Sequence, residues 1–84
     1  MFEVVFDPDA LEFLKKVEKD PAKRIWDKVM SAKEFPHHFF ERLSGREDYK
    51  LRVGDYRIIA DIDDKNKKII ITLIGHRKNV YENL

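Results

Sequence analysis

Hydrophobic and polar residues follow two different periods along this chain, which predicts both strands and helices. Phe2, Val4 and Phe6 alternate with other positions, as expected for a half-buried strand. Three further strands are predicted in the second half, at about 48–53, 56–63 and 68–75. In the last of them, residues 69–74 are apolar on both faces, which is typical of a central strand covered on both sides.

Between the first strand and the later three, apolar residues recur every three or four positions and predict two helices. Each should begin at an Asp-Pro pair, Asp7-Pro8 and Asp20-Pro21, because aspartate suits the N-cap and proline the first helical position. The second should end before Pro36. The apolar stripes, in which Phe13 and Trp26 are expected to belong to the core, contain Ala10, Leu11, Phe13, Leu14 and Val17, then Ala22, Ile25, Trp26, Val29 and Met30.

The predicted order of elements is β-α-α-β-β-β, with residues 37–47 as a connection that lacks clear periodicity. This order predicts an α+β domain with an N-terminal helical hairpin packed on a small, mainly antiparallel, four-stranded sheet. With 84 residues, positions 1–84 should form a single domain with one modest core.

Composition indicates the cellular compartment in which this domain is expected. No apolar run reaches the length of a membrane span, and the first residues do not resemble a signal peptide. The absence of cysteine excludes disulfides, zinc-thiolate sites and a thiol nucleophile, and it fits a reducing interior. A cytoplasmic protein without membrane contact is therefore expected.

The segment from Tyr49 to Arg57 predicts a tight hairpin with its cations on one face. Gly54-Asp55 is a two-residue turn signal, so Val53 should pair with Tyr56. Arg52 then lies opposite Arg57, and Lys50 shares their face because side chains alternate along a strand. Like charges opposite one another are destabilising. Lys50, Arg52 and Arg57 should therefore gather on the sheet face away from the helices, ready to bind a polyanion.

Charge is distributed unevenly along the chain, although the net charge is only +1. Residues 1–41 hold seven Lys/Arg and nine Asp/Glu, whereas residues 42–78 hold ten and six. The basic second half favours a phosphate-rich partner.

The residue types in this cluster suit phosphate chemistry without a metal ion or another cofactor. Lysine and arginine bind phosphate oxygens and stabilise charge that develops in a transition state. RNA carries its own nucleophile, the 2′-hydroxyl, so its cleavage requires mainly proton transfer by a residue such as His76 or Tyr81. The register of the last strand leaves open whether His76 or Arg77 faces the cations. Lys50 and Arg52 would equally suit a solvated edge strand, and His37-His38 lack the further ligands of a metal site.

Three segments together resemble the RelE toxins of the RelE/ParE superfamily. They are Leu43-Ser44-Gly45, the run Tyr49-Lys50-Leu51-Arg52-Val53-Gly54-Asp55-Tyr56-Arg57-Ile58-Ile59, and Ile74-Gly75-His76-Arg77-Lys78-Asn79-Val80-Tyr81. The resemblance covers nearly the whole chain and implies an mRNA interferase, which cleaves messages in the ribosomal A site. It also implies a RelB-like antitoxin that wraps the toxin, and operator DNA bound only through that antitoxin.

The resemblance implies a role for each matching position. Lys50 and Arg52 would hold the phosphate and assist proton transfer, although arginine at position 52 replaces a lysine of the family and stays protonated. Arg57 and Arg77 would stabilise transition-state charge, and Tyr81 would be the general base, with His76 as a further candidate. Lys78 completes the expected RNA-binding set. The alternatives are a ParE-like toxin that inhibits DNA gyrase without cutting RNA, or an inactive homologue that only binds an antitoxin.

Overall fold

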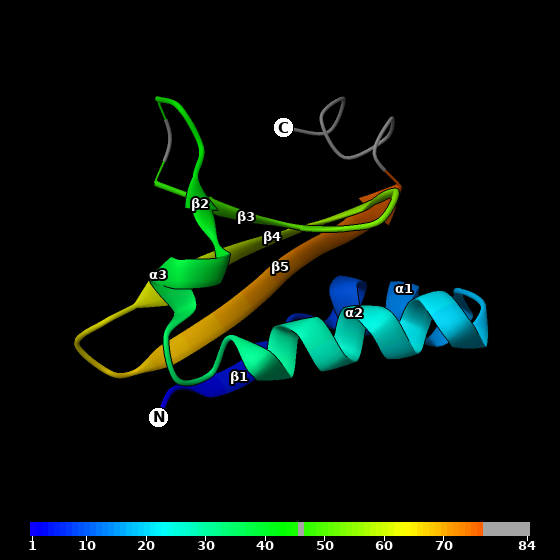
Figure 1. The fold of residues 1–84 in the computed structure, drawn as a ribbon, viewed down its shortest axis with the longest axis horizontal. Helices are drawn as coiled ribbons and strands as arrows, with labels where there is room; N and C mark the ends of the chain where they lie inside the picture. Colours follow the sequence, from blue (N-terminus) through cyan, green and yellow to red (C-terminus); the bar gives the residue numbers. More distant parts are fainter. Residues whose placement is uncertain (46, 77–84) are drawn as a thin grey trace.

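The computed structural model describes residues 1–45 and 47–76, which form a sheet with two long helices along one side (Figure 1). The elements follow one another as β1 (Glu3–Phe6), α1 (Pro8–Lys16), α2 (Lys19–Ser31), α3 (Pro36–Phe39), β2 (Glu41–Arg42), β3 (Tyr49–Val53), β4 (Tyr56–Asp63) and β5 (Lys68–His76). The predicted α+β class is confirmed.

The sheet has the order β1-β5-β4-β3-β2, with β1 parallel to β5 and every other pair antiparallel. The expected number of four strands is wrong by one, because Glu41 and Arg42 pair with Lys50 and Tyr49 to add an edge strand. Two residues are too few to produce a visible alternation of polar and apolar positions, so this strand has no periodic signal. The same holds for the four-residue helix α3, which also lies in the predicted connection.

Local sequence signals explain most of the helix boundaries. Asp7 is the N-cap of α1 and Pro8 its first residue, as predicted. α2 begins at Lys19 with Glu18 as N-cap, so Asp20-Pro21 lies inside the first turn and not at its start. Proline is tolerated there because the first helical amides have no partner within the helix. No helix in the described part of the chain is long and apolar enough to span a membrane.

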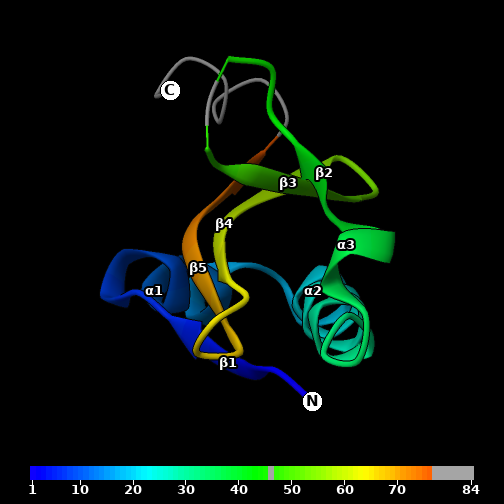
Figure 2. The same ribbon diagram turned by 90° about the vertical axis from the view of Figure 1, so that its left-hand side faces the viewer.

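The helices α1 and α2 pack against the apolar core of the sheet. Figure 2 shows α2 at the lower right, beneath α3 and β2. Ile25 and Val29 of α2 are fully buried against the sheet, and Ala10 of α1 joins the same core. Trp26 is the exception to the predicted stripe: it is 46% exposed and stacks on Phe6 with ring centroids 5.7 Å apart. It lies at the margin of the buried stripe, because the helix turns by about 100° between successive residues.

A β-bulge interrupts the pairing of β4 with β5. Ile59 pairs with Leu73 and Ala60 with Ile71, so Thr72 is an extra residue on β5, and its hydroxyl donates to the carbonyl of Ile59 at 3.2 Å. The bulge lets Ile69 and Ile71 before it, and Ile74 after it, all reach the core.

Ile58 offers a direct test of this core, because it is fully buried and pairs with Leu51 on one side and Ile74 on the other. We expect Ile58→Ala to lower the free energy of unfolding by about 2–5 kcal/mol, through lost burial and the cavity that remains. Urea denaturation followed by circular dichroism would measure the change. The control Val5→Ala, at a position 38% exposed, should change stability far less; equal losses would contradict this account of the core.

Candidate functional site

The hairpin of β3 and β4 has the register that its turn predicts. Val53 pairs with Tyr56, Arg52 with Arg57, and Lys50 with Ile59. Gly54 has a φ of 57°, and Asp55 is not among the residues with positive φ. A positive φ at only the first turn position is the requirement of a type II′ turn, which glycine meets without strain.

Lys50, Arg52 and Arg57 line one pocket of about 430 Å³. The pocket lies beside the edge strands, because α2, α3 and β2 also contribute to its walls. The described residues that line it are Lys28, His38, Phe39, Glu41, Lys50, Leu51, Arg52 and Arg57. The predicted gathering of the three cations is confirmed, but they were expected on the sheet face away from the helices, whereas residues of α2 and α3 also line this pocket.

Arg57 is buried, with 5% of its surface exposed. Its Nη1 donates hydrogen bonds to the carbonyl oxygens of Gly54, at 3.1 Å, and of Tyr56, at 3.0 Å. These two carbonyls partly offset the cost of burying the guanidinium. Arg57 therefore fastens the turn of the hairpin and also presents positive charge to the pocket.

The two other cations are more accessible. The Lys50 Nζ lies 4.0 Å from Glu41 Oε2, a contact that is weak because both side chains are partly solvated. Arg52 is exposed, and no ion pair forms with it within residues 1–45 and 47–76. Arg52 thus faces Arg57 across the hairpin with its charge available to a ligand.

The β4–β5 register decides where His76 lies. His76 pairs with Tyr56, and their rings meet edge to face at 5.7 Å. Gly75 is the residue opposite Arg57, so His76 faces the other side of the sheet from Arg57 and does not line the pocket. Arg77, Lys78 and Tyr81 lie outside the described residues.

Sequence reasoning missed four residues of the pocket: Lys28, His38, Phe39 and Glu41. Lys28 is on the polar side of α2, and its Nζ lies 5.4 Å from the centroid of the Phe39 ring. The other three belong to the segment without periodicity, where only the density of aromatic and histidine side chains was a signal.

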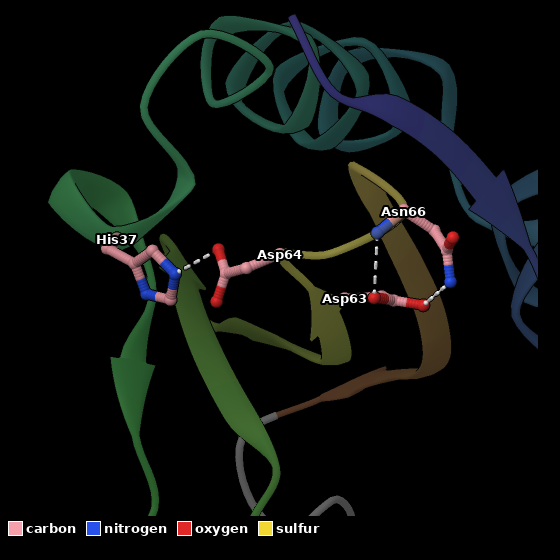
Figure 3. Close-up of polar contacts among 4 residues, drawn as sticks. All are labelled: His37, Asp63, Asp64 and Asn66. Carbon is pink, nitrogen blue, oxygen red and sulfur yellow. Dashed lines mark hydrogen bonds and ion pairs between the residues drawn. The ribbon is translucent and has the colours of Figure 1, made fainter.

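A second polar cluster lies at the distal β4–β5 turn (Figure 3). Asp63 accepts hydrogen bonds from the side-chain amide and the backbone amide of Asn66, at 2.9 and 3.0 Å, and these lower the pKa of Asp63. The next residue, Asp64, lies 2.8 Å from His37 Nε2. Among the residues that the structure describes, no group of three or more His, Cys, Asp or Glu could hold a metal ion.

The sequence matches a family model described as the ParE toxin of the type II toxin–antitoxin system parDE, over residues 4–81. The chain belongs to the ParE toxin family. It is therefore a type II toxin of the RelE/ParE superfamily, which confirms the resemblance inferred from the three sequence segments. A search of curated protein sequences finds no significant match.

Solved structures of RelE toxins share the fold of this ParE-family toxin. A RelBE toxin–antitoxin complex from Mycobacterium tuberculosis has a TM-score of 0.82 at 22% identity, covering 90% of this chain and 98% of that one. The intact RelBE complex from E. coli has a TM-score of 0.78 at 22% identity, with coverages of 90% and 96%. The isolated E. coli RelE toxin has a TM-score of 0.79 at 21% identity, with coverages of 99% and 94%.

The two facing arginines of the toxin should respond differently to truncation. We expect Arg57→Ala to lower the free energy of unfolding by about 2 kcal/mol, because it removes charge-assisted hydrogen bonds to the turn. Arg52→Ala should leave stability unchanged or raise it by less than about 1 kcal/mol, because it relieves the repulsion across the pair. Urea denaturation of both variants measures the difference, and a larger loss for Arg52→Ala would refute this assignment.

The turn that carries Asp63 yields a pH-dependent prediction. The pKa of Asp63 is lower in the folded toxin than its ordinary value, so its ionised form favours folding above that value. This contribution is lost as the pH falls through the folded pKa. Asn66→Ala removes the side-chain amide donor, and the pKa of Asp63 should rise toward its ordinary value in a carboxyl-resolved NMR titration. A pKa of Asp63 that does not rise would show that the Asn66 side chain is not what lowers it.

Proposed function

We propose that this toxin is a ribosome-dependent mRNA endoribonuclease that cleaves messages in the A site. The observation that supports this proposal is the pocket itself. Lys50, Arg52 and Arg57 converge on it with Lys28 beside them, and among the described lining residues Glu41 is the one carboxylate. Such an excess of positive charge in a concave site favours a phosphate and the additional charge that develops on it during reaction.

In the proposed reaction, the 2′-hydroxyl of the substrate attacks the adjacent phosphorus. A general base removes the 2′ proton, the bond to the 5′ oxygen breaks, and that oxygen takes up a proton as it leaves. The products are a 2′,3′-cyclic phosphate and a 5′-hydroxyl. Atoms and charge balance without a metal ion, because the nucleophile belongs to the RNA.

The described cations have separate parts in this scheme. Lys50 and Arg52 contact the phosphate, and Lys50 is the one of the two that can also transfer a proton, since arginine stays protonated. Arg57 holds the turn that carries its partner Arg52 and adds charge from a buried position. Arg77 and Tyr81 are assigned from the RelE resemblance alone, as a further charge stabiliser and as the general base. Lys78 would contact RNA, and His76 remains the alternative acid or base.

The proposed partners follow from the same family membership. Two of the three solved structures described above are toxin–antitoxin complexes. We propose that a RelB-like antitoxin inhibits this toxin, and that operator DNA is bound only through the resulting complex. The ribosome and mRNA would be its targets in the cytoplasm.

A second function has support from the family description, which names ParE toxins. In that case the toxin would inhibit DNA gyrase by contact and leave RNA intact. The cationic pocket would then have no substrate, which makes this the weaker hypothesis. A homologue that only binds an antitoxin would show neither activity.

The nuclease proposal can be tested by expressing the toxin and mapping the 5′ ends of cellular RNA. Wild-type toxin should arrest growth and produce cuts in the A site. Lys50→Ala and Arg52→Ala should each reduce cleavage roughly 100- to 1,000-fold, the usual cost of removing a group that stabilises transition-state charge. Arg77→Ala should likewise relieve growth arrest without unfolding the chain.

Lys68→Ala is the matched control for Lys50→Ala. Lys68 is also a strand lysine with a weak contact to a glutamate, 3.9 Å from Glu3, but it does not line the pocket. It should arrest growth like the wild type. Intact messages accompanied by DNA damage would favour gyrase inhibition, and growth without either effect would favour an inactive homologue.

A further inference from the structure

The adjacent histidines of α3 have different surroundings. His37 points toward Asp64 at the β4–β5 turn (Figure 3). Its ring also meets the ring of Tyr49 edge to face at 5.4 Å. His38 instead lines the cationic pocket. Phe35 stacks on His38, with ring centroids 5.3 Å apart and an angle of 20° between the planes.

The backbone that carries this aromatic pair is anchored by buried residues and hydrogen bonds. Pro36 and Phe40 are both buried, and the Phe40 amide donates to the Pro36 carbonyl at 2.8 Å. The His38 amide donates to the Phe35 carbonyl at 3.0 Å. Phe35 nevertheless leaves 60% of its surface exposed, so its ring contributes little to the core. The chain thus fixes a stacked pair of rings at the surface beside the pocket.

We propose that the Phe35–His38 pair is a stacking site for a nucleobase of single-stranded RNA. This proposal rests on the proposed function and adds a base-binding site to the phosphate-binding cations. A positively charged groove beside an aromatic platform is the combination that binds single-stranded nucleic acid, because every base can stack on a ring while its backbone contacts the cations.

The charges around the platform favour RNA over a protein segment. Lys28, Lys50 and Arg52 line the same pocket as His38, and of the lining residues in segments 1–45 and 47–76 only Glu41 is acidic. The pocket volume of about 430 Å³ is within the range of about 300–1,000 Å³ that is usual for small-ligand sites. A nucleotide whose phosphate meets the cations would have its neighbouring base close to His38.

The test measures binding of the full chain to two uncleavable 2′-O-methyl oligonucleotides of equal length and charge. One carries its bases, and the other is abasic at its central positions. By fluorescence anisotropy at one fixed low salt concentration, the wild type should bind the base-bearing strand roughly 5- to 150-fold more tightly, as expected for stacking of one base. His38→Ala and Phe35→Ala should reduce this preference and leave affinity for the abasic strand unchanged.

Two further variants separate stacking from charge and from general damage to α3. His38→Phe should keep the preference, because it retains an aromatic ring without an ionisable nitrogen. His37→Ala is the matched control, one residue away and outside the pocket, and it should behave like the wild type.

Equal affinity of the wild type for both oligonucleotides would overturn the proposal, as would failure to bind either strand. Loss of affinity for both strands in His38→Ala, with no rescue by His38→Phe, would assign His38 a charge role instead. Unchanged RNA binding in Phe35→Ala would also overturn it and would point to a protein partner for this surface. If Lys50→Ala lowers the affinity for both strands and the wild type shows no preference for bases, the phosphate-binding site is supported and the base-stacking site is refuted. If the toxin prefers the base-bearing strand but does not cleave RNA, the base-stacking site is supported and the nuclease function is refuted.

Discussion

The two-residue turn at Gly54-Asp55 is the constraint on which the rest of the site depends. Because side chains alternate along a strand, this turn fixes Arg52 opposite Arg57 and sends Leu51 and Ile58 to the core on the other face. Arg57 in turn bonds to the carbonyls of the turn that positions it. The same register therefore buries the apolar side chains and aligns the two arginines. A shift of one residue would remove the apolar side chains from the core and separate the arginines.

Most of this hairpin could be predicted from the sequence, because its signals are local. Glycine at a turn and β-rich runs on both sides determine the pairing of Val53 with Tyr56 without reference to other elements. The strand ranges and the α+β class follow from periodicity in the same way. The prediction of like charges on one face needed only the alternation of side chains, and the structure bears it out.

The parts that could not be predicted depend on contacts between distant segments. α3 and β2 are too short to show a period, so their places at the edge of the pocket come from tertiary packing of Pro36, Phe40 and the partners of β2. The burial of Arg57 could not be predicted either, because no sequence pattern indicates that its guanidinium will donate hydrogen bonds to the carbonyls of the turn. Trp26 was assigned to the core because its spacing matched the stripe, although it lies at the stripe's margin.

Thr72, the extra residue of the β-bulge, changes which residues of β5 face the helices. Before it, the odd-numbered positions 69 and 71 face the helices, and after it the even-numbered position 74 does so. The two halves of β5 therefore tolerate polar substitutions at opposite positions. Before the bulge a polar residue at an odd-numbered position would be buried in the core, and after it a polar residue at an even-numbered position would be. Deleting a single residue there would turn over the strand's C-terminal end relative to its beginning. The sequence conceals this change, because isoleucine or leucine stands at odd and at even positions on both sides of Thr72.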